Sequence, residues 1–387
     1  MKYDVIIIGS GFAGATLARK FAENNQKVLI LEKRNHIGGN MYEEVLENGI
    51  RIHKYGPHIF HTNSDRVFEF LRQFGDWYFY EHRVLGKIND KLVPIPFNFK
   101  SLEILYNQKE ASMLKEKLLK KYPDQKKISI LDLINDQDKE IQKLGRFIYK
   151  NVFENYTAKQ WNMPISQIDT SVINRVPVIL DYDDRYFQDK IQYMPKDGYT
   201  EIFNNMLNHP NITVELSTNA LDKLTVKGNK IYYLQQEFTN PVIYSGAIDE
   251  LFSYQYGALP YRSLKLDFET KNMNYYQPVS VVNYPNEEKF TRITEFKYFS
   301  NCLLSSSTTI LKEYPQNYDH KNEKTIPYYT IQNEENLKLY HQYLNQANKI
   351  PNLYLCGRLA EYKYYNMDAV IERALDLYET IFEKTHK

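Results

Sequence analysis

The fold is decided by the first stretch of the chain, which reads Val5-Ile6-Ile7-Ile8-Gly9-Ser10-Gly11-Phe12-Ala13-Gly14. The four apolar residues predict a strand, and the glycines predict a tight turn into a helix. In such a turn the first glycine makes the bend, the second admits a pyrophosphate, and the third lets the helix pack on the strand. A second apolar run, Val28 to Leu31, ends on Glu32, whose carboxylate would accept the hydroxyls of an adenosine ribose. The pattern predicts a dinucleotide site, with a purely structural glycine turn as the alternative.

A basic, glycine-rich loop follows Glu32 and reads Lys33-Arg34-Asn35-His36-Ile37-Gly38-Gly39-Asn40. A nicotinamide enzyme would normally continue into a crossover helix here. Two adjacent glycines instead leave backbone amides free to face a second part of the pyrophosphate, which favours an extended flavin dinucleotide over a plain loop. The cofactor-binding residues predicted in this half are Gly9, Gly11, Phe12, Ala13, Gly14, Glu32, Lys33, Gly39 and Asn40.

The end of the chain predicts a second anion site in the same domain. Asn352 to Arg358 forms an apolar strand that runs into Gly-Arg, and an amphipathic helix is expected from about Asp368 to Glu383. A strand, a glycine turn and a helix N-terminus together favour a bound anion. Arg358 and the amides near Met367 are therefore predicted to hold the pyrophosphate.

The fold class predicted is α/β, a Rossmann-like FAD-binding domain with an inserted helical domain and an antiparallel β-sheet domain. The stretch after residue 100 is rich in Lys, Glu and Leu at helical spacing, whereas the later segments alternate between turns as in an antiparallel sheet. The predicted strands Ile212 to Leu216, Lys230 to Gln235 and Val242 to Ser245 return to the nucleotide-binding sheet. The predicted boundaries are 1–80 with 196–246 and 346–387 for the FAD domain, 98–172 for the insertion, and 81–97 with 173–195 and 247–345 for the antiparallel sheet.

Composition excludes several other functions for the 387 residues. Lys plus Arg number 49 and Asp plus Glu 48, a net charge of +1, so bulk charge attracts neither nucleic acid nor an anionic membrane. Cys302 and Cys356 match no disulfide or metal spacing, which suits a reducing cytoplasm. No secretion signal or membrane-spanning run is expected, so a soluble cytoplasmic protein without membrane insertion is predicted. His53, His58 and His61 lie close together in the sequence, but no cluster of carboxylates or cysteines joins them, so no metal is expected.

Two features in the middle of the chain stand out. Trp161, one of two tryptophans, follows a helix expected from about Asp138 to Tyr156 and could stack on a base or sugar; a wedge between domains is the alternative. Arg175 lies in the apolar run Val-Ile-Asn-Arg-Val-Pro-Val. A charge in such a run either meets a carboxylate or faces an anion.

Several motifs, taken together and in order, resemble the bacterial UDP-galactopyranose mutases, a family of flavin-dependent nucleotide-sugar mutases. The likeness spans essentially the whole chain. The motifs are Glu32 to Asn40, His53 to Thr62, Tyr156 to Trp161, Tyr261 to Leu264, Thr291 to Ile293, Lys312 to Pro315 and Gly357 to Tyr365.

The resemblance implies an isomerase that converts UDP-galactopyranose to UDP-galactofuranose for cell-surface polysaccharide synthesis, with no net redox change. In this family, reduced FAD attacks the anomeric carbon through its N5, UDP leaves, and the sugar ring opens and recloses on the covalent adduct. The implied partner is a UDP-sugar, and a homodimer is left open.

The resemblance also implies roles for individual residues. Arg175 and Arg292 would hold the diphosphate, with hydroxyl donors from Tyr186, Tyr314 and Tyr364, and Tyr156 would stack on uracil. Trp161, Asn283 and Asn366 would line the sugar pocket, and Pro57, His58 and His61 would lie beside the isoalloxazine ring. The catalytic set is therefore expected to be His61, Arg175, Arg292 and Tyr364.

Asn366 stands where the family frequently has Asp, and Pro57 where it frequently has Ala. The lost charge at Asn366 leaves the sugar open, so the same chemistry on a 2-acetamido or 6-deoxy nucleotide sugar is the main alternative. A flavin oxidoreductase of amine-oxidase type, or a nucleotide-binding module without catalysis, are the others.

Overall fold

The nucleotide-binding half is built on a parallel five-stranded sheet. We describe a computed structural model of the chain, which covers residues 2–161, 177–299 and 305–385. The strand order is β12-β2-β1-β16-β22, and every neighbouring pair is parallel. The strands are β1 (Val5–Ile8), β2 (Val28–Leu31), β12 (Ile212–Glu215), β16 (Val242–Tyr244) and β22 (Leu353–Leu355). The predicted Rossmann-like sheet is confirmed.

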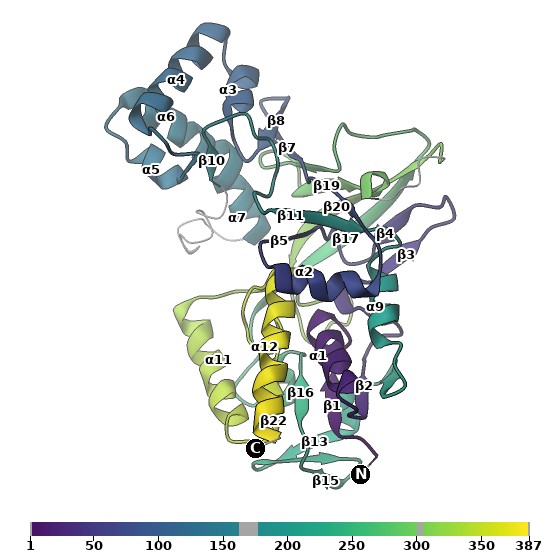
Figure 1. Ribbon diagram of the computed structural model, residues 1–387. Helices are drawn as coiled ribbons and strands as arrows, with labels where there is room; N and C mark the ends of the chain where they lie inside the picture. The colour runs from purple at the N-terminus through teal and green to yellow at the C-terminus, as the bar shows by residue number, and fades with distance from the viewer. Residues whose placement is uncertain (1, 162–176, 300–304, 386–387) are drawn as a thin grey trace.

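Both faces of this sheet are covered, as a parallel sheet requires. Ile7 and Ile30 lie in one apolar cluster with the helices α1 (Phe12–Glu23), α9 (Tyr199–Leu207) and α12 (Met367–Thr385). Their neighbours Ile6 and Leu29 point to the opposite face. That face is covered by α10 (Ile248–Leu251), α11 (Glu334–Ala347) and the small sheet of β13 (Leu224–Lys227), β14 (Lys230–Tyr233) and β15 (Gln236–Phe238). Figure 1 shows α12, in yellow, beside α1.

Two elements differ from the sequence-based expectation. The strand expected at Lys230 to Gln235 is β14, and it belongs to the antiparallel sheet β13-β14-β15 rather than to the parallel sheet. Tyr340 and Tyr343 of α11 pack in the cluster of the parallel sheet, although the predicted boundaries placed this segment with the antiparallel domain. In both cases local alternation or periodicity gives the type of element but not its packing partner.

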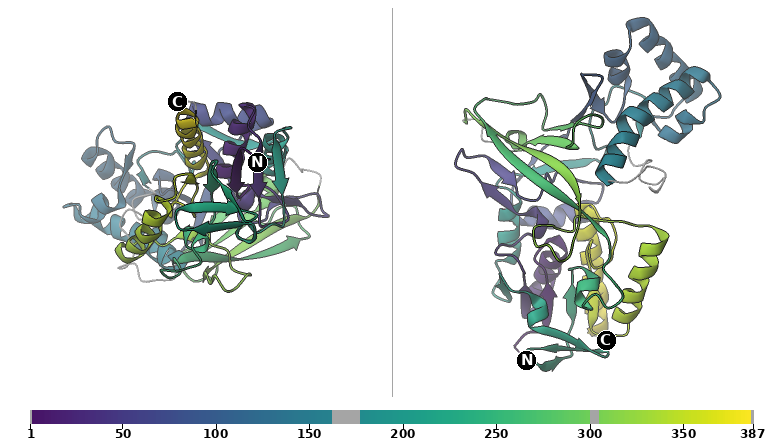
Figure 2. Two further views of the ribbon diagram at one scale, coloured as in Figure 1. Left: turned by 90° about the horizontal axis from the view of Figure 1, so that it is seen from below. Right: turned by 180° about the vertical axis from the view of Figure 1, so that it is seen from behind.

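The second large sheet has seven strands in the order β21-β17-β20-β19-β18-β7-β8. All pairs are antiparallel except β18 with β7. The long β17 and β20 ribbon lies between the helical insertion and the parallel sheet in Figures 1 and 2. The strands are β7 (Val84–Ile88), β8 (Lys91–Ile95), β17 (Tyr261–Lys271), β18 (Val281–Asn283), β19 (Arg292–Glu295), β20 (Thr308–Asn317) and β21 (Tyr329–Thr330).

Short sheets connect these layers. The order β5-β11-β6 joins β5 (Phe60–Thr62), β11 (Ile191–Pro195) and β6 (Trp77–Phe79), and β3 (Glu43–Val45) pairs with β4 (Arg51–His53). Helix α2 (Asp65–Leu71) begins after Ser64, whose hydroxyl accepts the amide of Val67 and caps the helix. Strands β7 and β8 form a hairpin, because Asn89 and Asp90 adopt positive φ and make its turn.

The helical insertion has its own apolar core. Its elements are α3 (Phe99–Leu105), α4 (Gln108–Lys121), β9 (Lys127–Ile128), α5 (Ile130–Ile134), α6 (Lys139–Ile148) and α7 (Asn155–Trp161), with β10 (Val178–Ile179) paired to β9. Asp138 caps α6 by accepting the amides of Glu140 and Ile141. The expected helix therefore begins as predicted, but it continues to Trp161 through a π-helical turn at Tyr149–Glu154.

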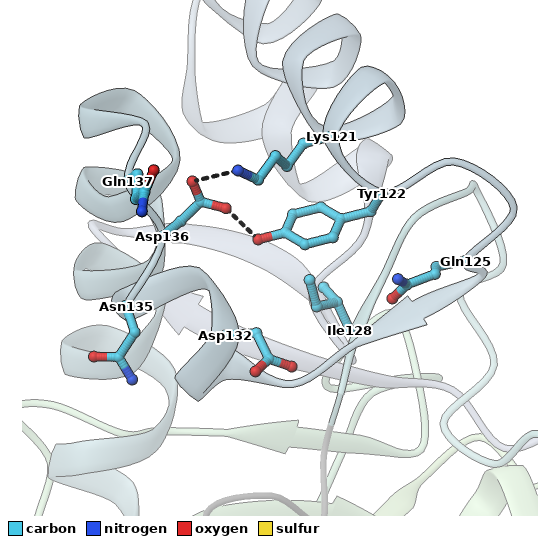
Figure 3. A pocket seen from close by; sticks show the side chains of 8 residues that line it. All are labelled: Lys121, Tyr122, Gln125, Ile128, Asp132, Asn135, Asp136 and Gln137. Carbon is cyan, nitrogen blue, oxygen red and sulfur yellow. Dashed lines mark hydrogen bonds and ion pairs between the residues drawn. The ribbon is translucent and has the colours of Figure 1, made fainter.

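A polar cavity of about 490 Å³ lies in this insertion, away from the parallel sheet. Asp136 accepts a hydrogen bond from the Tyr122 hydroxyl and lies 3.6 Å from the Lys121 ammonium (Figure 3). Burial works to raise the pKa of Asp136, but the hydrogen bonds from Tyr122 and the Asp138 amide lower it overall. These contacts tie the end of α4 to the α5–α6 connection, so we assign the cluster a structural role.

Candidate active site

The carboxylate after β2 is held by its own neighbours. Glu32 is 6% exposed, and its Oε2 accepts the Ser10 amide at 2.8 Å and the Ser10 hydroxyl at 2.6 Å. Its Oε1 accepts the Arg34 amide at 3.0 Å. Each carboxylate oxygen can accept more than one hydrogen bond, so Glu32 is a fixed acceptor at the end of the strand.

The glycine turn makes room at the N-terminus of α1. A Cβ on Gly14 would lie 2.0 Å from the Gly9 carbonyl oxygen, so the helix can approach β1 only without a side chain there. Gly9 and Gly39 have φ of 94° and 56°, and a Cβ on Gly39 would lie 3.1 Å from the Cα of Gly11. The two predicted glycine loops therefore face each other across the helix N-terminus, where a phosphate is favoured.

Arg34, rather than the predicted Lys33, reaches into this region. Its Nη2 donates to Asn40 Oδ1 at 2.9 Å, and its guanidinium lies 4.1 Å from the centre of the Tyr55 ring. Its Nη1 is buried and meets no acceptor among the described residues. Lys33 is 68% exposed and pairs with Glu250 at 3.1 Å, so it points to the surface.

Arg358 is fixed from several sides. Its guanidinium donates to the backbone carbonyls of Tyr328 and Tyr365 at 3.0 and 2.7 Å. It also lies 4.7 and 5.5 Å from the ring centres of Tyr364 and Tyr329. The predicted anion-binding segment around Arg358 therefore contacts the aromatic rings of Tyr329 and Tyr364.

These residues fit a dinucleotide cofactor. The close approach of two glycine loops leaves backbone amides rather than side chains at the helix N-terminus. The buried Nη1 of Arg34 is a charged donor that an acceptor on a ligand would satisfy. Met367 begins α12 at the predicted position, and Phe12 and Ala13 open α1.

An arginine lies at the centre of the large sheet. In the strand register Arg292 is opposite Asn283 on β18 and opposite Glu313 on β20, which places the three side chains on one face. The Arg292 Nε donates to Glu313 Oε1 at 2.5 Å, and Glu313 is 3% exposed. Burial works to lower the pKa of Arg292, but the Glu313 carboxylate raises it overall, so Arg292 stays charged.

Three tyrosines surround this arginine. Burial raises the pKa of Tyr156, Tyr186 and Tyr329, and the charge of Arg292 works in the opposite direction for each. Tyr329 also stacks on Tyr364, with ring centres 6.0 Å apart. The raised pKa values keep the buried hydroxyls protonated, so they are neutral hydrogen-bond donors beside a permanent positive charge.

The structure places Tyr314 away from Arg292, and it places Tyr329, which was not predicted, beside Arg292. Tyr314 follows Glu313 on β20, so its side chain lies on the opposite face of the sheet from Arg292. There it contacts Phe290 and Lys265. The only sequence signal for Tyr329 is a Tyr-Tyr pair after a proline, which is weak in a chain with 34 tyrosines.

The histidines take separate positions. His61 Nδ1 lies 2.9 Å from Asp189 Oδ2, and its ring stacks on Phe187 at 3.5 Å. The His58 amide donates to His53 Nδ1 at 2.9 Å. Burial lowers the pKa of His58 well below its usual value, and the charges of His53, Arg358 and Arg292 act in the same direction. His58 is therefore neutral and lies close to both arginines.

A further buried histidine was not predicted. His82 is 4% exposed, and its Nδ1 lies 3.3 Å from the Ser280 hydroxyl. Burial lowers its pKa to about 3, with Arg292 and His61 adding to the effect. Its backbone carbonyl accepts the Tyr186 amide at 2.7 Å, so His82 supports one of the site tyrosines.

The remaining predicted residues are placed as follows. Asn366 is exposed just before α12, and Pro57 is half-buried beside His58. Arg175 lies outside the described residues, as does the side chain of Trp161, whose backbone ends α7. The described residues contain no group of three or more His, Cys, Asp or Glu side chains that could hold a metal. Within the same residues, no helix is long and apolar enough to cross a membrane.

The fold and the site define a dinucleotide-binding protein of the flavin-binding kind with an adjoining cluster of a buried arginine and tyrosines. A family model described as UDP-galactopyranose mutase matches residues 151–364, and one described as an NAD(P)-binding Rossmann-like domain matches residues 7–74. The chain belongs to the UDP-galactopyranose mutase family, which makes it an isomerase.

Two curated relatives and one solved structure show the extent of the similarity. The UDP-galactopyranose mutase of Mycoplasma pneumoniae is 36% identical over 387 residues, covering 99% of this chain and 97% of the relative. The dTDP-fucopyranose mutase of Escherichia coli is also 36% identical, covering 96% of each chain. The crystal structure of a reduced UDP-galactopyranose mutase has a TM-score of 0.72 at 15% identity and covers 98% of this chain and 96% of its own. Membership of the family and the Rossmann-like fold point to a flavin cofactor.

Proposed function

We propose that this chain interconverts UDP-galactopyranose and UDP-galactofuranose with FAD in its reduced form. The observation that carries the proposal is the position of Arg292, a charged side chain paired with the buried Glu313 and ringed by protonated tyrosines. A nucleoside diphosphate is the ligand that such donors suit, because it carries negative charge and many acceptor oxygens. Arg358 lies over the rings of Tyr329 and Tyr364, and its neighbour Gly357 packs near Ala13 at the dinucleotide turn.

The chain's residues bind and orient the leaving diphosphate. The Arg292 Nε donates to Glu313, which fixes the guanidinium. The two Nη groups of Arg292 are then left to face a ligand. Tyr186, Tyr329 and Tyr364 donate hydroxyl hydrogen bonds to the same oxygens. We propose Tyr329 in place of Tyr314 in this set, together with Arg175 from the sequence-based expectation. Because the donors are already in place, they stabilise the charge that develops when the diphosphate departs.

The sugar lies between this pocket and the cofactor. When bound, a reduced flavin supplies a nucleophilic nitrogen for covalent catalysis at the anomeric carbon. His61, held by Asp189, and the neutral His58 form the wall on the cofactor side. Asn283, on the same sheet face as Arg292, Asn366 at the start of α12 and Trp161 are proposed sugar contacts, and Tyr156 is the proposed stacking partner of the base.

The test is turnover by the reduced protein with three substrates. The purified protein is reduced with dithionite and incubated with UDP-galactofuranose, dTDP-fucofuranose or the 2-acetamido analogue of the UDP-sugar, and products are separated by chromatography. We expect the UDP-galactose isomers to interconvert with the highest kcat/KM. Preference for dTDP-fucofuranose would instead assign the activity of the Escherichia coli relative.

Two controls separate a mutase from an oxidoreductase. The oxidised protein should be inactive, and the reduced protein should turn over many substrate molecules without consuming reductant. Oxygen uptake that rises with substrate concentration would contradict the proposal, because ring contraction leaves the oxidation state of the sugar unchanged. A homodimer and a cytoplasmic location stay predictions from the sequence.

A further inference from the structure

The turn that carries Arg358 is held by a carboxylate within its own loop. Glu361 Oε2 accepts the Gly357 amide at 2.9 Å, and the Glu361 amide donates to the Gly357 carbonyl at 3.0 Å. Gly357 has a φ of 111°, a conformation that L side chains avoid. Glu361 thus closes this turn with both its side chain and its backbone amide.

The turn that this carboxylate holds packs against the start of α1, where the pyrophosphate is predicted. A Cβ on Gly357 would lie 3.4 Å from the Cβ of Ala13, in the first turn of α1. The helix N-terminus at that point favours an anion. An unpaired carboxylate on the neighbouring loop would repel the same anion, because two like charges near the interior of a protein interact strongly.

Arg373 on α12 removes this conflict. Its Nε donates to Glu361 Oε1 at 2.8 Å, and the Glu361 side chain is only 15% exposed. One Glu361 oxygen accepts the Gly357 amide and the other accepts the Arg373 guanidinium, and the Tyr365 hydroxyl is a further, neutral hydrogen-bond partner. The pair also borders a cavity of about 460 Å³ between α11, β22 and α12, so a shorter or neutral side chain at either position meets no steric conflict.

We propose that Arg373 is a positioning residue for the flavin cofactor, which neutralises Glu361 so that this carboxylate can shape the Gly357–Arg358 turn without repelling the pyrophosphate. The inference rests on the proposed function, because it takes the cofactor to be a flavin dinucleotide. Arg373 acts through Glu361 and touches neither the cofactor nor the substrate in this scheme. The charge of Glu361, rather than its shape, is what makes Arg373 necessary.

The test is the affinity of the apoprotein for FAD, measured by quenching of flavin fluorescence on titration. Four proteins are compared: the wild type, Arg373→Met, the double variant Glu361→Gln with Arg373→Met, and the matched control Arg19→Met. The control removes an Arg–Glu ion pair of comparable exposure from α1. The melting temperature of each apoprotein is recorded in parallel, so that loss of fold is separated from loss of affinity.

We expect Arg373→Met to weaken FAD binding about tenfold, because the Glu361 carboxylate then places an unscreened negative charge beside the phosphates. The double variant should recover to within about twofold of the wild type, because it retains a side chain of the same shape but has no charge to offset. Arg19→Met should bind as the wild type does. Recovery in the double variant is what a merely structural role of the ion pair would not produce.

Two results would overturn the inference. Wild-type affinity in Arg373→Met shows that Glu361 needs no partner, and equal weakening in the single and double variants shows that the pair acts only through packing. A wild-type apoprotein that fails to bind FAD contradicts the proposed flavin function itself and removes this inference with it. The wild-type titration therefore distinguishes the two failures.

Discussion

The two ends of the proposed ligand site are built in different ways. The adenosine end, from Gly9 to Asn40, is made of neighbouring residues, and its donors are mostly backbone amides around glycines. The diphosphate end collects side chains from five separate segments, namely Tyr156, Tyr186, Arg292, Tyr329 and Tyr364. A cofactor that stays bound can rely on local backbone geometry. A substrate whose charge changes during the reaction needs charged and hydroxyl side chains, which only the tertiary fold brings together.

The largest effect is expected at the diphosphate end. Replacing Arg292 with Met should lower the turnover of the reduced protein about a thousandfold, because a buried charged hydrogen-bond donor is lost where the diphosphate leaves. Flavin should stay bound, as judged from the absorbance spectrum, because the adenosine end is intact. Loss of flavin together with activity would show that the two ends are not separate.

The same substitution leaves Glu313 buried without its partner, which costs about 3–5 kcal/mol in unfolding free energy. The double variant Arg292→Met with Glu313→Gln should regain most of that stability in urea unfolding. It should not regain activity. Recovery of turnover would remove Arg292 from the substrate site.

At the adenosine end, a substitution at Gly14 should lower both stability and flavin binding. A methyl group there would lie 2.0 Å from the Gly9 carbonyl oxygen, so Gly14→Ala should lower the unfolding free energy by about 1–3 kcal/mol and weaken flavin binding in the same titration. The control is Gly228→Ala, where φ is 61° and no atom lies within 4 Å of the new Cβ. That change costs about 1–2 kcal/mol through backbone strain alone and should leave flavin affinity unchanged.

A paired substitution tests the tyrosine that the tertiary structure selects. Tyr329→Phe should raise KM for the nucleotide sugar about tenfold, since a hydroxyl donor to a charged ligand is removed. Tyr314→Phe should change KM less than about twofold, because Tyr314 lies on the other face of β20. Steady-state kinetics with both variants decide the matter, and the reverse order of effects would restore Tyr314 to the site.

The pH dependence of stability should come from the diphosphate end, where the buried histidines lie. The folded-state pKa of His82 is lowered to about 3 by burial, against an ordinary value of 6.5. Between these values the unfolded chain binds a proton that the folded chain does not, so stability is full above pH 6.5 and falls as the pH drops. We expect His82→Asn to reduce the slope of unfolding free energy between pH 6.5 and 5 by up to about 1 kcal/mol per pH unit. An unchanged slope in urea titrations would contradict this.

The smallest effect separates two adjacent cations at the adenosine end. Lys33→Ala should change FAD affinity less than about twofold, since an exposed pair with Glu250 contributes little. Arg34→Ala should weaken binding several-fold more, because it removes a partly buried donor between Asn40 and Tyr55. Fluorescence titration of both variants gives the comparison, and equal affinities would place Arg34 outside the cofactor site.

The sequence could predict those features whose contacts join residues close together in the chain. The start of the helix near Asp138 and the turn from Gly9 to Gly14 depend on residues a few positions apart, and the structure confirms them. The family model and the curated relatives confirm the family that the motifs predicted. The face on which Tyr314 lies could not be predicted, because strand alternation relative to Arg292 depends on the pairing of β19 with β20.

Other contacts had no local signal at all. Arg34 and Lys33 are neighbouring cations in one loop, and only the approach of Tyr55 shows which one turns inward. The Arg373–Glu361 pair joins a helix to a turn, and the sequence pattern shows only two charged residues in an amphipathic region. His82 reads as one histidine in a strand-like stretch, yet burial makes it a neutral group behind Tyr186.

By itself, the sequence determined the dinucleotide motif, the acidic residue after β2, the two chain termini in one domain and the family. These properties depend on glycine conformation, apolar periodicity and motif order, which are written along the chain. Only the tertiary structure decided which tyrosine accompanies Arg292, which carboxylate fixes Arg292, and which of the cations Lys33 and Arg34 turns inward. Those choices depend on strand register and on burial, because a charge or hydroxyl takes its role from the groups that the fold places beside it.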